Sequence, residues 1–106
     1  VYMGPKGTWT PCHRDVYCSY SWSANIVGLK LWVLFPSNVS EFLIDGNLEV
    51  VYDVSDSKSI HTSKFKKRFP RFPEAVKRAR IAIQHPGEAI FVPSGWYHQV
   101  TNLTDV

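Results

Sequence analysis

Two histidines and one aspartate are the residues with the clearest capacity for chemistry in this chain. His13 and Asp15 are two positions apart, so on an extended strand both side chains project from the same face. His98 follows a tight-turn sequence, Pro93-Ser94-Gly95. Two imidazoles and one carboxylate on one side of a metal ion form the facial triad that holds non-haem Fe(II) and leaves coordination sites open. The spacing therefore predicts a metal site formed by His13, Asp15 and His98.

Other interpretations of the same residues have to be weighed. A His-x-Asp triplet also occurs at ordinary surfaces, where it binds nothing. His-Arg-Asp at 13–15 also resembles a kinase catalytic loop, but that pattern has Asn five residues after the Asp, and Tyr20 occupies this position. A structural zinc site using Cys12, His13 and Cys18 is disfavoured, because adjacent residues of a strand point to opposite faces.

A lysine inside an apolar strand suggests a site for an anion. Lys30 precedes Trp32 and Leu34 with a spacing of two, and a cation on the inner face of such a strand needs an anionic partner. The distal carboxylate of 2-oxoglutarate has the right chemistry, with Thr10 offering a hydroxyl and Asn25 an amide. The alternatives are an outward-facing or edge Lys30, and local backbone hydrogen bonds for Thr10 and Asn25.

The segments that would position these residues are short and mainly extended. Alternation, β-branched residues and Gly/Pro turns predict strands at 8–20, 30–35, 48–52, 81–84, 88–92 and 96–101, with 21–27 continuing the first strand or turning. Residues 73–80 are the best helix candidate, because Pro73 suits a first helical position, and the polar stretch 53–67 is predicted as loop. The fold class is therefore mainly β, a sandwich or barrel with a short helix in an insertion.

Charge is distributed unevenly over the 106 residues, which carry a net charge of +3 and are 44% hydrophobic. The segment 58–80 holds nine basic residues and one acid, Glu74, so it carries +8 and the rest of the chain −5. Phe65, Phe69 and Phe72 lie among these cations, as in a module that binds RNA or an acidic partner, although a solvated insertion is favoured. The longest apolar run, 31–35, is too short to span a bilayer.

Three segments together resemble the JmjC-domain 2-oxoglutarate/Fe(II) oxygenases. They are GTWTPCHRD at 7–15, YSWSANIVGLKLW at 20–32 and PGEAIFVPSGWYHQVTN at 86–102. The resemblance implies a double-stranded β-helix, the cupin-like jelly roll. It implies Fe(II), 2-oxoglutarate and O₂ as cofactors and cosubstrates. It also implies iron ligands His13, Asp15 and His98 and a 2-oxoglutarate site of Lys30, Thr10 and Asn25, with Ser23 as a competitor for Asn25. Aromatic residues near the site are candidates to line the substrate path, with core packing as the favoured alternative for each, namely Tyr17, Trp22 and Trp96 together with Trp9 and Tyr97.

The same resemblance implies the reaction and the partner. We expect hydroxylation of a protein side chain, most closely a lysine of a translation release factor, with succinate and CO₂ as coproducts. The alternative within the family is demethylation of N-methyl-lysine. Neither nucleic acid nor membrane is expected as a partner, and the family suggests the cytoplasm or nucleus. Residues 1–106 are expected to be an incomplete piece of one catalytic domain, with a basic insertion at about 53–80.

Overall fold

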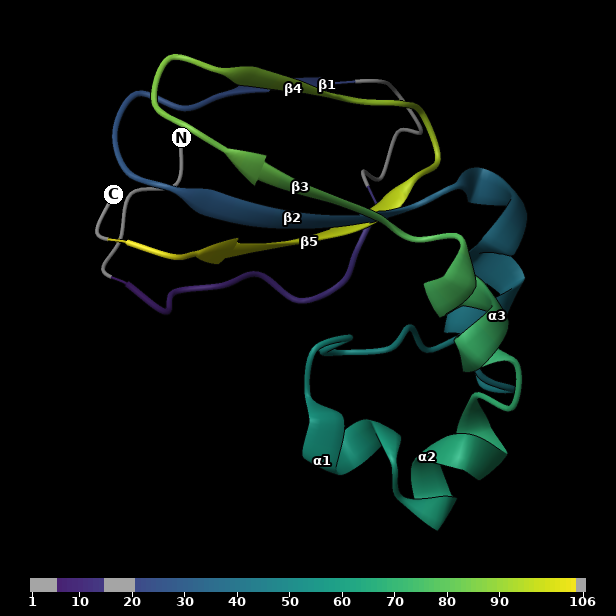
Figure 1. Ribbon diagram of the computed structural model, residues 1–106. Coiled ribbons are helices and arrows are strands. Elements are labelled where there is room, and N and C mark those ends of the chain that lie inside the picture. Colours follow the sequence, from purple (N-terminus) through teal and green to yellow (C-terminus); the bar gives the residue numbers. More distant parts are fainter. Residues whose placement is uncertain (1–5, 15–20, 105–106) are drawn as a thin grey trace.

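Two antiparallel sheets and a group of short helices make up the computed structural model, which describes residues 6–14 and 21–104 (Figure 1). One sheet pairs β1 (Ser21–Ala24) with β4 (Ala89–Val92). The other has the order β3 (Arg80–Gln84), β2 (Lys30–Phe35), β5 (Tyr97–Asn102). The sheets lie one above the other in Figure 1. The predicted mainly β fold class is confirmed.

The central strand β2 begins and ends at the predicted residues, and Pro36 follows it. Its alternate side chains Lys30, Trp32 and Leu34 are buried on the face that meets the smaller sheet, where Val92 of β4 packs against Trp32 and Leu34. Residues paired directly across antiparallel strands point to the same side. The pairing therefore sets up three rows on this face: Gln84–Lys30–Asn102, Ala82–Trp32–Val100 and Arg80–Leu34–His98.

The prediction of a loop over 53–67 was wrong, because two short helices form there. They are α1 (Ser57–Ile60) and α2 (Ser63–Arg68). Asp56 caps α1 by accepting hydrogen bonds from the backbone N–H groups of the first turn, and Thr62 Oγ1 accepts one from Phe65 N at 3.1 Å to cap α2. These caps satisfy N–H groups that have no partner within so short a helix.

The third helix, α3 (Phe72–Lys77), lies where a helix was predicted but ends earlier, since Arg80 already belongs to β3. It packs against a 3₁₀ helix, η1 (Ser37–Leu43), which follows β2. Residues of both helices belong to a second apolar core, separate from the cluster of Trp32, Leu34 and Val92 between the sheets. It is made of Cys12, Phe35, Val39, Phe42, Leu43, Val51, Phe69, Phe72, Ala75 and Tyr97. The segment 58–80 is thus a packed helical layer attached to the β-sheets.

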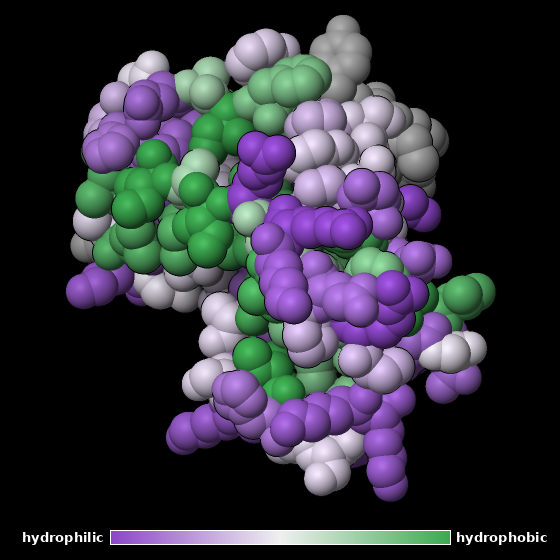
Figure 2. Space-filling view, turned by 45° about the vertical axis from the view of Figure 1, so that its right-hand side comes forward, coloured by the Kyte–Doolittle hydropathy of each residue, from purple (hydrophilic) through white to green (hydrophobic). Residues whose placement is uncertain are grey.

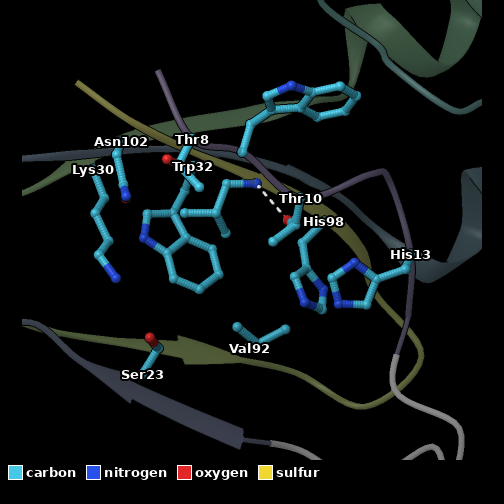
Figure 3. A pocket seen from close by; sticks show the side chains of 11 residues that line it. Thr8, Thr10, His13, Ser23, Lys30, Trp32, Val92, His98 and Asn102 are labelled. Atoms are coloured by element: carbon cyan, nitrogen blue, oxygen red, sulfur yellow. Dashed lines mark hydrogen bonds between the residues drawn. The ribbon is translucent and has the colours of Figure 1, made fainter. Parts of the chain in front are cut away.

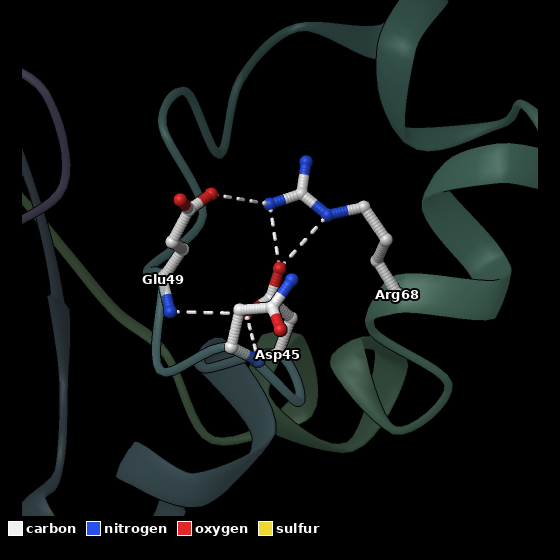
Figure 4. A network of polar contacts seen from close by, with 4 residues as sticks. Asp45, Glu49 and Arg68 are labelled. Atoms are coloured by element: carbon white, nitrogen blue, oxygen red, sulfur yellow. Dashed lines mark hydrogen bonds and ion pairs between the residues drawn. The ribbon is translucent and has the colours of Figure 1, made fainter.

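A turn at Asp45 is tied to helix α2 by an ion pair (Figure 4). Arg68 donates to Asp45 Oδ2 from Nε at 3.0 Å and from Nη2 at 2.7 Å, and Nη2 also contacts Glu49. The strand predicted at 48–52 reduces to an isolated bridge between Ile44 and Val50. Among the described residues, no helix is long and apolar enough to cross a membrane.

Candidate functional site

A cavity of about 310 Å³ lies between the two sheets (Figure 3). Its walls come from the first extended segment, from β2 and β5, and from the opposite sheet. They consist of Thr8, Trp9, Thr10, His13, Ser23, Lys30, Trp32, Val92, His98, Val100 and Asn102. Figure 3 shows the two imidazoles side by side at one end and the Lys30 side chain at the other. Four residues predicted for the site, namely Thr10, His13, Lys30 and His98, thus line one cavity.

The two imidazoles are held close together by the backbone. His13 and His98 form an isolated antiparallel bridge, and their ring centroids are 4.3 Å apart with an angle of 57° between the planes. A metal–nitrogen bond of about 2.1 Å, with the ring centroid about 1 Å further away, puts two imidazoles that share one ion at a right angle about 4.5 Å apart. The observed separation fits two ligands of one metal ion.

The hydrogen bonds of both rings also favour metal binding. His13 Nδ1 lies 2.8 Å from the carbonyl oxygen of Pro11, and His98 Nδ1 lies 3.2 Å from that of Trp96. A carbonyl oxygen only accepts, so each Nδ1 must be the donor and carry the proton. Each Nε2 then holds the lone pair that a metal ion takes, and the Nδ1–H bond fixes the ring orientation. The donor set therefore suits a metal ion.

The third predicted ligand, Asp15, lies outside the described residues, as does Cys18. Across residues 6–14 and 21–104, no group of three His, Cys, Asp or Glu side chains gathers at a point. Cys12 belongs to the second apolar core, and its burial raises the pKa of the thiol to about 12. The Cys12 side chain is buried in that core and does not line the cavity that His13 lines, which disfavours the zinc interpretation.

Lys30 lies on the central strand β2 with only 6% of its surface exposed, so the outward-facing or edge alternative is wrong. It is flanked in its row by Gln84 and Asn102, which are also buried. Asn102 lines the cavity and was missed in the sequence. The signal was present, since His98, Val100 and Asn102 follow one another at a spacing of two and so share a face.

The two predicted polar partners of Lys30 lie in different places. Thr10 lines the cavity, and its Oγ1 accepts a hydrogen bond from Val100 N at 3.3 Å. Asn25 does not line it. Its Nδ2 donates to Gly28 O at 2.7 Å within the turn between β1 and β2, which is the local backbone bonding weighed as the alternative. Ser23, two residues earlier on β1, lines the cavity instead.

The predicted substrate-path aromatics do not line this cavity where they are described. Trp22 is 66% exposed and packs against Phe91 in a tilted arrangement, with ring centroids 5.0 Å apart. Trp96 is half-buried and packs against the core between the sheets. Tyr17 lies outside the described residues. Substrate contact by these three residues stays a prediction, whereas Trp9 does line the cavity and packs edge-to-face on Tyr52.

A buried glutamine connects the two sheets beside the cavity. Gln84 is 1% exposed, and its Oε1 accepts a hydrogen bond from Trp32 Nε1 at 2.9 Å. Its Nε2 donates to the carbonyl oxygens of Ser23 at 2.7 Å and Glu88 at 3.0 Å. One side chain thereby fixes a wall residue of each sheet, Trp32 and Ser23. The sequence marked Gln84 only as the end of a strand.

The chain forms a β-domain in which two antiparallel sheets enclose a histidine pair and a buried lysine. Comparison with known proteins leads to the same class of domain. The chain belongs to the cupin-like domain family, whose model matches residues 1–106. The similarity to JmjC-domain oxygenases is confirmed by relatives that each match 99% of this chain. This chain is 51% identical over 105 residues to the 2-oxoglutarate and iron-dependent oxygenase JMJD4 of Danio rerio and 44% identical to that of Homo sapiens. It is 46% identical over 106 residues to the arginine-specific demethylase JMJ20 of Arabidopsis thaliana.

The matched region is a limited part of those relatives. The chain covers 24% of the Danio rerio and Homo sapiens proteins and 21% of the Arabidopsis thaliana protein. The chain therefore spans less than a quarter of the length of these curated relatives.

Proposed function

We propose that the protein containing this chain is a 2-oxoglutarate- and Fe(II)-dependent oxygenase, and that the chain is part of its catalytic domain. The observation that carries the proposal is the adjacency of His13 and His98 in a cavity whose far end holds the buried Lys30. Asp15, two residues after His13, is the proposed third iron ligand. The names of the relatives in zebrafish and human, both 2-oxoglutarate and iron-dependent oxygenases, support it.

Each end of the cavity has its own task in this proposal. The imidazole Nε2 atoms of His13 and His98 would hold the iron, and Lys30 would bind the distal carboxylate of 2-oxoglutarate with help from Thr10, since all four residues line the cavity. The apolar walls of Trp32, Val92 and Val100 keep water away from the site between them. When both are bound, iron and 2-oxoglutarate supply O₂-dependent oxidation, with succinate and CO₂ as coproducts and a hydroxyl group for the substrate.

For the substrate we propose a protein side chain, and within that class a lysine of a translation release factor, modified in the cytoplasm or nucleus. The support for this choice is the sequence resemblance of the three segments 7–15, 20–32 and 86–102. Iron and 2-oxoglutarate carry out the same chemistry on many substrates. The substrate is therefore selected by the protein surface around the mouth of the cavity.

Succinate formation tests the reaction. The full-length protein is incubated with Fe(II), 2-oxoglutarate and O₂, and succinate is measured for the wild type and for His98→Ala. The wild type is expected to form succinate and His98→Ala to form none. His61→Ala, a change at an exposed histidine on the helical layer, is the matched control and should keep wild-type turnover. Equal turnover by wild type and His98→Ala would overturn the proposal.

N-demethylation is the second candidate, and the 46% identity to the arginine-specific demethylase JMJ20 favours it. Hydroxylation of an N-methyl group gives an unstable hemiaminal that releases formaldehyde, so both outcomes use the same site. Mass spectrometry of the protein product distinguishes them. A stable gain of one oxygen atom supports the hydroxylase, and loss of a methyl group with formaldehyde release supports the demethylase.

A further inference from the structure

A cationic groove lies beside the sheet that carries His98. It has a volume of about 570 Å³ and is formed where helix α3 ends, β3 begins and η1 starts. Its lining includes Lys77, Arg78, Arg80, Trp96, Pro36 and Asn38. Figure 2 shows hydrophilic side chains over much of the helical side of the molecule, next to a hydrophobic area on the β-sheet side.

The three cations of this groove are not neutralised from within the part of the chain that the structure describes. Neither Lys77, Arg78 nor Arg80 forms an ion pair with a described residue, and no acidic residue lines the groove. Two other arginines of the helical layer do form ion pairs: Arg68 pairs with Asp45 and Glu49, and Arg71 pairs with Glu74. Like charges gathered around one groove repel each other and favour an anionic occupant.

The groove is adjacent to the histidine end of the cavity. Arg80 pairs with Leu34, and Leu34 pairs with His98, so all three occupy one face of the sheet. Two strand spacings put the Arg80 and His98 backbones about 10 Å apart. Trp96, which lines the groove, also accepts the Nδ1–H hydrogen bond of His98 on its carbonyl oxygen. A polypeptide lying in the groove would therefore pass close to the proposed iron site.

The aromatic residues of the basic segment are arranged for packing and not for base stacking. Phe69 and Phe72 are buried, and half-buried Phe65 contacts both, with ring centroids 4.9 and 5.2 Å away. Recognition of single-stranded RNA relies on exposed aromatic rings that stack on bases. The packing of these three rings removes the stacking platform that the sequence suggested and favours an acidic peptide over RNA.

We propose that the groove formed by Lys77, Arg78, Arg80 and Trp96 docks an acidic segment of the protein substrate and thereby presents the neighbouring residue to the site. This proposal rests on the proposed function for its protein substrate. The carboxylates of the segment would contact the three cations, and aliphatic parts of its side chains would contact Trp96.

The test uses the full-length protein and a fluorescein-labelled octaglutamate peptide, with binding measured by fluorescence anisotropy. The wild type is expected to bind, and more weakly as salt rises from about 50 to about 200 mM, since the Debye length shortens. The variant Lys77→Gln/Arg78→Gln/Arg80→Gln should lose at least about tenfold in affinity, because each cation makes a charge-assisted contact. The matched control, Lys64→Gln/Lys66→Gln/Lys67→Gln, removes equal charge from α2 and should lose less than about twofold.

Three outcomes would overturn the groove proposal. The first is an equal loss of peptide binding in both triple variants, and the second is no loss in either. The third is that a twelve-nucleotide single-stranded RNA binds more tightly than the peptide and loses this binding only in the groove variant. Succinate formation without protein substrate separates this result from the proposed function. The rate of this succinate formation should be the same in the groove variant and the wild type. If the wild type forms no succinate, the proposed oxygenase function is contradicted, whereas the peptide-binding result still tests the groove.

Discussion

His13 and His98 donate backbone hydrogen bonds to each other in both directions, at 3.0 Å from His13 N to His98 O and at 2.7 Å from His98 N to His13 O. This bridge joins two segments that are far apart in the sequence, and it sets the separation of the rings through the main chain. The side chains do not have to be drawn together by a metal ion. A site whose ligands are already positioned loses less conformational entropy on binding.

Replacement of one proposed ligand should therefore weaken metal binding and leave the fold intact. His13→Ala is expected to weaken Fe(II) or Co(II) affinity at least about 100-fold, since a direct ligand is lost. Both backbone hydrogen bonds remain in the variant, so its free energy of unfolding should change by less than about 1 kcal/mol. Anaerobic calorimetric titration measures the affinity, with His61→Ala as the control. Unchanged affinity in His13→Ala would contradict the assignment.

Gln84 should contribute to stability through all three of its hydrogen bonds. Gln84→Met keeps the length of the side chain but leaves Trp32 Nε1 and the carbonyl oxygens of Ser23 and Glu88 without this partner. Because buried polar groups that lose a partner are costly, the free energy of unfolding should fall by about 2–4 kcal/mol. Trp32→Phe removes only one donor and should cost less. Urea denaturation measures both, and a loss in Gln84→Met below that of Trp32→Phe would refute the connecting role.

The strands of the two sheets were predictable because their signal is local and periodic. The predictions at 48–52 and over the described part of 8–20 were wrong, since only isolated bridges form there. Residues 30–35 form β2 as predicted, and the turn at Pro93-Ser94-Gly95 brings β5 to His98 as expected. Helices α1 and α2 escaped prediction because they are only four and six residues long. Their stability comes from caps and from packing of Phe65, neither of which creates a helical period.

Part of the cavity lining was predictable where the side-chain type itself is unusual. His13, His98 and a lysine in an apolar strand attract attention without a structure. Ser23 and Asn25 are two residues apart, and both have short polar side chains that can donate and accept hydrogen bonds. The sequence could therefore not distinguish the one that lines the cavity from the one that closes a turn. Which of the two residues lines the cavity depends on where β1 ends. The end of β1 is set by its pairing with β4, which is far away in the sequence.

The turn at Asp45 should make stability depend on pH on the acid side. Hydrogen bonding from the backbone N–H of Glu49, and then from the Arg68 guanidinium, lowers the pKa of Asp45 below its usual value. A lowered folded-state pKa means that this stabilisation is complete above about pH 4, the unfolded value, and is lost as pH falls through the folded value.

Two variants separate these causes. Asp45→Asn should lower the melting temperature at pH 7, and its difference from the wild type should shrink as pH falls below about 4. Arg68→Met should keep part of the pH dependence, because the N–H of Glu49 still donates to Asp45. Thermal melts across this pH range measure both. A pH-independent difference between wild type and Asp45→Asn would exclude the carboxylate as the source.

The turn that leads into β5 should require glycine at one position. Gly95 has φ +78°, and an added Cβ would lie 3.7 Å from Ser37 Cβ, an ordinary contact, so the cost of Gly95→Ala is backbone strain alone. We expect a loss of about 1–2 kcal/mol in the free energy of unfolding. Gly46→Ala is the control, since no heavy atom of the described chain lies within 4 Å of its Cβ position and its φ is not positive. Equal losses in both variants would contradict this explanation.

Lys30→Met should separate cosubstrate binding from metal binding. Methionine keeps most of the aliphatic volume in the cavity but removes the ammonium group, and with it a charge-assisted contact of about 1.5–3 kcal/mol with the distal carboxylate. The KM for 2-oxoglutarate in the full-length protein should therefore rise about 10- to 150-fold. Fe(II) affinity should stay at the wild-type value, because Lys30 lies at the opposite end of the cavity from the histidine pair. Lys66→Met, at an exposed position of α2, is the matched control and should change neither quantity. An unchanged KM in Lys30→Met would remove Lys30 from the cosubstrate site, and a parallel loss of Fe(II) affinity would show that the cavity had collapsed.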